Sequence, residues 1–157
     1  MAFVLLKDGT QDSTDSFVGS WRRYREYLAS IADRLPAAAR DFALGEWHHD
    51  FSDHRAPHDS WVESVQIYET ASGERKEIRQ IQIKVRLLGA YHDGYIEIEY
   101  KNVAQYSMAS DYPNHGSWLY DEVRLSDTGS VIHEVEIGGS TWVIECEDIH
   151  YIWLPEG

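Results

Sequence analysis

The sequence has little cysteine, little proline and no long apolar run. A single cysteine, Cys146, excludes an intrachain disulfide and any zinc motif built from several cysteines. The apolar start MAFVLL reaches Lys7 and Asp8 at once, so it is too short for the core of a signal peptide or for a membrane span. Only 4 prolines in 157 residues, with 13% aromatic side chains, favour a folded globule over a disordered chain. We therefore expect a cytoplasmic protein without a membrane anchor.

Basic side chains are also scarce. The formal net charge is -13, and after residue 90 the only lysine and arginine are Lys101 and Arg124. Such a surface repels phosphate, so we expect neither nucleic acid nor an anionic membrane as a partner. It attracts a basic protein, although acidity that serves only solubility explains the same composition. Both interpretations stay open at this point.

Residues 1–45 have the pattern of helices. Their apolar side chains recur at spacings of three and four residues, which is one stripe of an amphipathic helix. Asp12 or Ser13 is suited to cap that helix, and Pro36 ends it. Pro36 also suits the start of a short second helix, which Gly45 closes. The stripe consists of Phe17, Trp21, Tyr24, Leu28, Ile31 and Leu35.

Residues 61–154 change to a period of two. Short alternating runs end at the turn signals ASGE, YHDG, SDTG and GGS, which indicates antiparallel strands joined by hairpins. The predicted fold class is mainly β (α+β), with residues 1–157 as a single domain. We expect an antiparallel meander that forms a sandwich or a strongly curved sheet, with the N-terminal amphipathic helix and the short second helix packed on it. Pairing of the apolar faces in one hairpin sets two basic residues near two acidic ones. These residues are Lys84, Arg86, Glu97 and Glu99.

Residues 46–60 form a loop rich in histidine and aspartate, with the sequence HHDFSDHRAPHDS over residues 48–60. Alternate side chains of an extended segment lie on one side, where imidazole and carboxylate groups can share a metal ion. Pro57 disfavours the helix that a histidine pair four residues apart needs, and no HExxH signature is present. The other interpretation is a polar loop in which His58 and Asp59 bond to the backbone at the start of the first strand. We favour this polar loop and predict no cofactor. The alternative metal site consists of His48, Asp50, His54 and His58.

The other polar side chains give no enzyme motif. Asp121 and Glu122 are neighbours on a predicted strand, so they point to opposite faces, and we expect exposed or turn-forming acids instead of a catalytic pair. His133 alternates in phase with apolar neighbours and is predicted to lie half-buried in the core. Cys146 is predicted to be a small buried core residue. No nucleophile, phosphate-binding or dinucleotide-binding motif occurs, which favours a protein that is not an enzyme.

One segment resembles a known group of proteins. In PHDSWVESVQI a His-Asp-Ser triplet runs directly into the first strand. It resembles the start of small acidic β-rich bacterial proteins with an HDS-strand motif, which are uncharacterised or of the polymorphic-toxin immunity type. The segments YIEIEYKNVAQYSM, WLYDEVRL and ECEDIHYIW are similar to that group as well, so the resemblance covers residues 58–153. It implies a compact domain without catalysis that binds a partner through an acidic face.

The predicted function is therefore non-enzymatic binding of a basic protein, such as neutralisation of a basic toxin. Two other functions stay open: a metal-binding protein or metal-dependent enzyme centred on residues 48–59, and a β-barrel that holds a small apolar ligand among tyrosine and tryptophan side chains. A homodimer is compatible with each of them. The acidic strands on either side of the turn GGS form the predicted contact surface, because no lysine or arginine follows Arg124. Its residues are Glu134, Glu136, Glu145 and Glu147.

Overall fold

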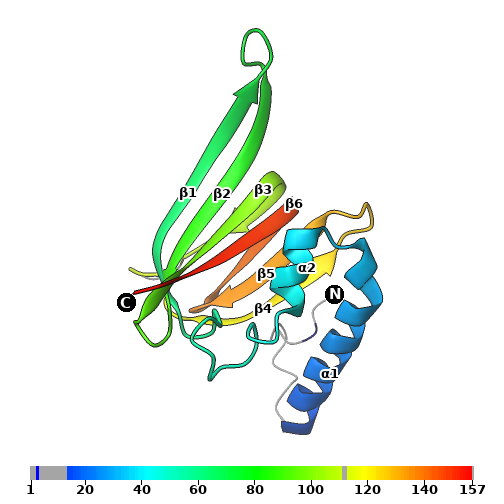
Figure 1. Ribbon diagram of the computed structural model, residues 1–157, viewed down its shortest axis with the longest axis vertical. Coiled ribbons are helices and arrows are strands. Elements are labelled where there is room, and N and C mark those ends of the chain that lie inside the picture. Colours follow the sequence, from blue (N-terminus) through cyan, green and yellow to red (C-terminus); the bar gives the residue numbers. More distant parts are fainter. Residues whose placement is uncertain (1–2, 4–13, 111–112, 157) are drawn as a thin grey trace.

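The computed structural model describes residue 3, residues 14–110 and residues 113–156, without the side chains of residues 14–17. The cap predicted at Asp12 or Ser13 and the core position predicted for Phe17 lie outside the described residues. The chain forms one six-stranded sheet preceded by two α-helices (Figure 1). None of the helices in the described ranges has the length and apolarity needed to cross a membrane.

The two helices lie where the sequence predicts them. Helix α1 spans Thr14–Ile31 and continues as a 3-10 turn over Ala32–Arg34, and α2 spans Ala37–Leu44. Pro36 is the N-cap of α2 and Gly45 its C-cap. The C-terminal part of the apolar stripe is at most 5% exposed, whereas Trp21 is half-buried. The buried residues of the stripe are Tyr24, Leu28, Ile31 and Leu35.

All strand pairs of the sheet are antiparallel, and the spatial order is β1-β2-β3-β6-β5-β4. The strands are β1 Trp61–Ser72, β2 Ile78–Leu88, β3 Gly94–Met108, β4 Trp118–Leu125, β5 Val131–Ile137 and β6 Ser140–Pro155.

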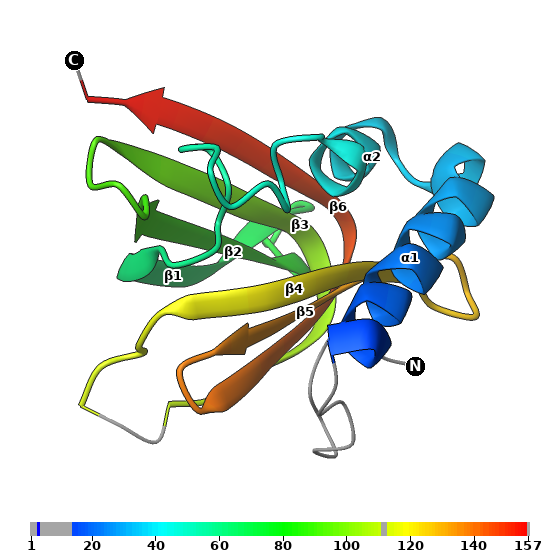
Figure 2. The same cartoon turned by 90° about the horizontal axis from the view of Figure 1, so that it is seen from below.

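The sheet consists of two three-stranded meanders, β1–β2–β3 and β4–β5–β6. They join through β3 and β6, in a register that runs from Gly94 opposite Pro155 to Met108 opposite Trp142. The order departs from a simple meander at this one place, because β4, which follows β3 in the chain, lies at the far edge. The predicted mainly-β antiparallel fold with two N-terminal helices is confirmed. Of the two predicted forms, the strands adopt the strongly curved sheet (Figure 2).

The two edge strands, β1 and β4, approach each other at one end of the curved sheet. Trp61 forms an isolated bridge with Ser117, and the Trp118 N–H donates to the Ser60 carbonyl at 3.0 Å. The sheet is otherwise open, so it is not a closed barrel. Its concave face is filled by side chains of the strands, of α2 and of the loop after α2. The large side chains buried there include Tyr100, Trp118, Trp142 and Phe42.

The β1–β2 hairpin projects beyond the other strands (Figure 1). The register between β2 and β3 stops at Ile81 opposite Val103, whereas β1 and β2 stay paired as far as Ser72 opposite Ile78. Every residue of β1 from Gln66 onward is exposed. The distal hairpin is therefore a two-stranded ribbon with solvent on both faces.

The cross-strand ion pairs predicted for the β2–β3 hairpin are confirmed. Lys84 Nζ lies 3.2 Å from a Glu97 carboxylate oxygen and 3.9 Å from one of Glu99. Arg86 Nη1 lies 2.7 Å from Glu97 Oε1. The acids of this hairpin are therefore neutralised within the sheet.

Candidate functional site

The histidine loop, residues 46–60, runs along the outer edge of β4. At its end the Asp59 N–H donates to the Trp118 carbonyl at 2.7 Å, and Ser60 accepts from the Trp118 N–H. The loop therefore takes the place of a further strand beside the start of β4.

Two histidines of the loop continue this pairing through their rings. His58 Nδ1–H donates to the Leu119 carbonyl at 2.6 Å, and His49 Nε2–H donates to the Asp121 carbonyl at 3.3 Å. Successive outward carbonyls of an edge strand would otherwise face water or another chain. The bond predicted from His58 to the backbone is present, and it belongs to this edge.

Two tyrosines of α1 complete the covering of β4. The Tyr24 hydroxyl accepts the Val123 N–H at 2.7 Å and lies 3.4 Å from the Val123 carbonyl, to which it donates. The Tyr27 hydroxyl accepts the Leu125 N–H at 2.9 Å. Helix α1 thus lies beside the edge of the sheet instead of over its face.

Behind this edge, Asp121 is the centre of a buried polar network on the concave face. Its Oδ2 accepts from His48 Nε2 at 2.7 Å and from His133 Nε2 at 2.8 Å, and its Oδ1 accepts from Trp118 Nε1 at 3.2 Å. The Tyr100 hydroxyl donates to His133 Nδ1 at 2.8 Å. All five side chains are at most 2% exposed. Asp121 and His133 are thus more deeply buried than the sequence predicts.

His48 carries the positive charge of this network. Its Nδ1 lies 2.7 Å from the Phe42 carbonyl, so both ring nitrogens face acceptors and both must donate. Burial lowers the pKa of His48, but the Asp121 carboxylate outweighs burial, and the net pKa is raised. For Asp121, burial raises the pKa, while His48 and His133 hold it well below its usual range. The result is a buried ion pair.

His49 is neutral and faces a pocket. Its side chain is 20% exposed, and its ring stacks on His48 with 4.2 Å between the centroids. Burial, reinforced by the neighbouring His48 charge, lowers the pKa of His49 to about 3. Because Nε2 donates to the Asp121 carbonyl, Nδ1 carries the lone pair.

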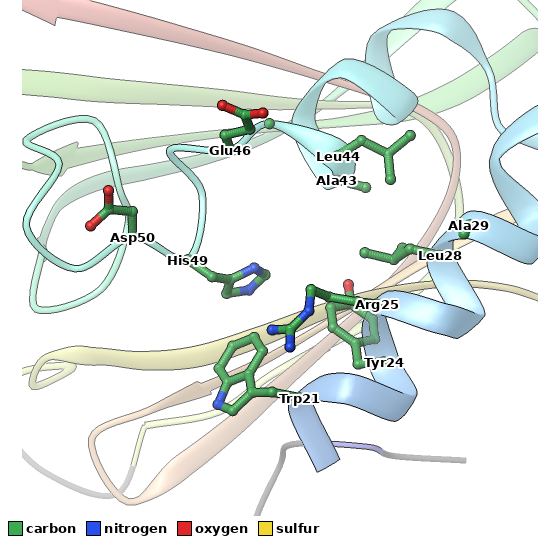
Figure 3. Close-up of a pocket in the computed structure, with 11 residues that line it drawn as sticks. Trp21, Tyr24, Arg25, Leu28, Ala29, Ala43, Leu44, Glu46, His49 and Asp50 are labelled. Carbon is green, nitrogen blue, oxygen red and sulfur yellow. The ribbon is translucent and has the colours of Figure 1, made fainter. Parts of the chain in front are cut away.

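A pocket of about 390 Å³ lies between α1, α2 and His49 (Figure 3). That volume is within the range of small-molecule sites. The walls are mainly apolar, and Arg25, Glu46 and Asp50 supply charges around them. The apolar walls come from Trp21, Tyr24, Leu28, Ala43 and Leu44.

Within the described part of the chain, one group of potential metal ligands has its donor atoms within 4.8 Å of one another: His48, His49 and Asp121. The two histidines come from the loop and the aspartate from β4, 72 residues after His49. The sheet therefore brings together ligands that no local spacing in the sequence could indicate.

The alternative metal site predicted from the sequence is not assembled as such. Its second histidine, His54, pairs with Asp93 at 2.5 Å and stacks on Tyr91 with 3.9 Å between centroids. Asp50 accepts hydrogen bonds from the backbone and hydroxyl of Ser52 within the loop. Of the predicted set His48, Asp50, His54 and His58, only His48 belongs to the group around Asp121.

Of the acids predicted to contact a partner, Glu134 is buried. It is 1% exposed, and its Oε1 lies 2.5 Å from Arg124 Nη2. Arg124 also binds Glu122, at 2.7 Å, and Glu122 is 0% exposed. The expected exposure of Glu122 and Glu134 is thus not found. The alternation of side chains along β4 and β5 places both acids beside Arg124. The prediction that the acids are exposed considered only lysine and arginine after Arg124, not Arg124 itself.

The remaining predicted contact residues lie on the same face of β5 and β6, as their alternation predicts. Glu145 accepts from Ser130 at 2.8 Å and from Gln105 at 2.7 Å. Glu147 is exposed and accepts from Asn102 at 2.7 Å, and Glu136 is half-buried. These acids therefore form part of a hydrogen-bonded polar face.

The sequence contained one signal for the buried network. Asp121 is in phase with Val123, so an aspartate on the apolar face of a strand indicates a buried partner of opposite charge. The partner could not be identified in this way. His49 has no local signal either, since its role depends on the edge of β4 next to it.

The comparison with known families does not assign an activity to this chain. A family model described as a protein of unknown function (DUF4085) matches residues 8–137, which include both helices and strands β1 to β5. No curated protein matches the chain. No solved structure matches it either. The match supports the uncharacterised part of the resemblance, and the immunity type stays a prediction.

Proposed function

Because the chain belongs to the DUF4085 family, whose function is unknown, we propose a function from the geometry of its sheet. The protein is a non-enzymatic binding protein that takes a segment of a basic protein partner as an added strand along β1. The observation that carries the proposal is the open outer edge of β1. Neutralisation of a basic toxin, which the resemblance implies, is the specific form of the proposal.

The register identifies which backbone groups of β1 point outward. The Gly89 N–H donates to the Gly94 carbonyl at 2.9 Å, which fixes the ladder between β2 and β3. The backbone groups of successive residues on an antiparallel strand point to alternate sides. The backbone N–H and C=O groups of Lys84 and Arg86 therefore bond to β1. The backbone groups of their partner residues on β1 point toward β2, and those of the residues in between point away from the sheet. The outward residues are Val65, Ile67, Glu69 and Ala71.

Nothing in the described ranges bonds to these outward groups. β1 is an edge of the sheet, and its isolated bridge to Ser117 involves Trp61, before this stretch. An extended segment of another protein can satisfy such a row of N–H and C=O groups, with affinity supplied by main-chain hydrogen bonds. The stretch from Val65 to Ala71 is long enough for a short added strand.

Apolar side chains accompany the open edge. Ile67 is 45% exposed, Tyr68 38% and Ile78 57%, on a ribbon whose two faces both meet solvent. Exposed apolar groups on a projecting element favour a contact with another protein. They would provide side-chain contacts on either side of an added strand.

Charge favours a basic occupant. The net charge of the chain is -13, and β1 itself has no lysine or arginine, although one of its two acids, Glu69, is paired with Arg79 of β2. Complementary charge accelerates association and disfavours a second acidic chain. For this reason we favour a basic partner over a homodimer at this edge.

The test is a proline at an outward position. Glu69→Pro removes one outward N–H while leaving the hydrogen bonds between β1 and β2 in place, since proline is tolerated on edge strands. Glu69→Gln is the matched control, because it also loses the carboxylate that binds Arg79. Partners are recovered from the native host with each bait, identified, and measured with purified protein.

The proposal expects a basic partner that binds the wild type and Glu69→Gln but binds Glu69→Pro at least about tenfold more weakly, a loss of about 1.4 kcal/mol. Circular dichroism and thermal melting check that Glu69→Pro is folded. An identified partner that binds all three proteins equally would contradict strand addition at β1.

A further inference from the structure

We propose that His48, His49 and Asp121 bind one divalent transition-metal ion of the zinc class next to the pocket in Figure 3, which His49 lines. The site is independent of the strand addition proposed for β1, since it lies beside β4 at the opposite edge of the sheet. It uses two imidazole nitrogens and one carboxylate oxygen, a donor set typical of zinc sites that keep a further position for water or a ligand.

The donor distances suit an ion once the His49 ring has rotated. The donor atoms lie within 4.8 Å of one another, with His48 Nε2 2.7 Å from Asp121 Oδ2 and His49 Nε2 3.8 Å from Asp121 Oδ1. Ligands of a tetrahedral zinc ion, each about 2.0–2.1 Å from the metal, stand roughly 3.3 Å apart. One distance must therefore lengthen and the other shorten, each by less than about 1 Å. The His49 ring must also rotate out of its stack on His48, because the ring planes are only 15° apart and the lone pairs of two parallel imidazoles cannot meet at one ion.

The surroundings already orient two of the three ligands, His48 and Asp121, for metal binding. The Phe42 carbonyl accepts from His48 Nδ1–H, which leaves Nε2 directed at Asp121. Trp118 and His133 donate to the two oxygens of the Asp121 carboxylate. Such outer hydrogen bonds orient ligands in metal sites and raise their affinity.

The protons can be accounted for. His48 loses the Nε2 proton that it now donates to Asp121, and this proton goes to solvent as the ion takes its place. The proton on His49 moves from Nε2 to Nδ1, which frees the Nε2 lone pair and breaks the bond to the Asp121 carbonyl. Both histidines then ligate as neutral imidazoles with an ionised aspartate.

An ion can reach the site past His49. His49 lines the pocket and is 20% exposed, whereas the side chains of His48 and Asp121 are 0% and 3% exposed. The remaining coordination position therefore belongs to the pocket side, where water or an oxygen of a small ligand can enter. The apolar walls around it, with Trp21 and Leu44 among them, would exclude bulk water from that ligand.

The experiment uses full-length protein purified without a histidine tag and treated with a chelator. Zinc is titrated by calorimetry, and metal analysis gives the bound stoichiometry after desalting. His49→Gln removes the ligand on the pocket side, and His54→Ala is the matched control, since His54 is exposed and pairs with Asp93. We expect one equivalent of zinc in the wild type and in His54→Ala, and at least about tenfold weaker binding in His49→Gln.

A wild type that binds no zinc, or a folded His49→Gln that binds it as tightly as the wild type, would overturn the proposal. Loss of binding in His54→Ala with retention in His49→Gln would overturn it too, because the ion would then sit elsewhere. If His49→Gln does not fold, histidine-selective NMR of the wild type decides. Zinc must then shift the ring signals of His48 and His49, and unchanged ring signals would overturn the site.

Discussion

The two edges of the sheet are built in opposite ways. On β4, at least one outward backbone group of Leu119, Asp121, Val123 and Leu125 bonds to an imidazole or phenol group of the histidine loop or α1. On β1, the outward groups from Val65 to Ala71 meet no such group in the ranges that the structure describes. An uncovered edge strand invites pairing with another chain. Covering one edge and leaving the other bare restricts that pairing to β1.

The difference extends to what lies behind each edge. Behind β4 stands a buried ion pair, so side chains at this edge are coupled to the core. The distal part of β1 has solvent on both faces, so its side chains contribute little to the core. Substitutions should therefore affect stability strongly at the covered edge and weakly at the open one.

The largest effect is expected for Asp121→Ala. This change removes the acceptor of three donors and leaves the buried His48 charge without its partner. Loss of one member of a buried ion pair destabilises by about 3–5 kcal/mol. Urea unfolding measures this, with Glu69→Ala on the open edge as the control. A loss below about 1 kcal/mol would mean that the network does not hold the covered edge.

The second effect is the pH dependence of the metal-free protein. Below pH about 6.5 the unfolded chain protonates His49, whereas in the folded state its pKa is about 3. Stability should therefore fall as the pH is lowered, by up to about 1.4 kcal/mol per unit, or roughly 2 kcal/mol from pH 6.5 to 5.

His48 affects stability at higher pH than His49 does. Its raised pKa gives stability that is present below pH about 6.5 and lost as the pH rises through the folded-state value. Stability should therefore be highest near pH 6.5. Urea unfolding across this range in a folded His49→Gln variant should lose the acid slope, and an unchanged slope would assign it to other groups.

A smaller loss is expected for Tyr24→Phe. The hydroxyl accepts the buried Val123 N–H, so its removal leaves that donor unsatisfied at a cost of about 1–2 kcal/mol. Tyr68→Phe on the open edge is the matched control and should be neutral. Equal midpoints of unfolding for the two variants would show that the tyrosine does not stabilise the edge.

The smallest effect is expected for Ile67→Lys on the open edge. Ile67 is 45% exposed, so the free energy of unfolding should change by less than about 0.5 kcal/mol. Binding of a basic partner should nevertheless weaken, because the new charge lies beside the added strand. A loss of stability comparable to that of Tyr24→Phe would show that the ribbon packs against the core.

The sequence predicts the elements well and their neighbours poorly. Periodicity and the Pro36–Gly45 punctuation are local, so they locate α2 and the hairpins. The pairing of β3 with β6 depends on contacts far apart in the chain, and no local pattern encodes it. The candidate site is the least predictable part, because Asp121 contacts the histidines of the loop only when β4 lies beside that loop in the folded protein.

Two differences between the sequence prediction and the structure have the same origin. Glu134 was expected to be exposed because no cation follows Arg124, yet Arg124 itself lies beside it across the β4–β5 pair. The alternative metal set is grouped by its spacing, whereas His54 contacts Asp93 and His48 contacts Asp121. Distance along the chain was used in both cases where distance across the sheet decides.

The join between the two meanders has a consequence for how the chain folds. β1–β2–β3 and β4–β5–β6 each form from neighbouring hairpins, but the centre of the sheet needs β3 to pair with β6, whose nearest partners in the chain are Met108 and Trp142. Closing a loop of that length is entropically costly and slow compared with hairpin formation. During synthesis β3 must wait for β6, the final strand of the sheet, and until then its inner edge is bare. The nascent chain thus passes through a stage in which apolar side chains of β3 lack their neighbours on β6, and a chaperone or an early misfolded pairing competes with the native one.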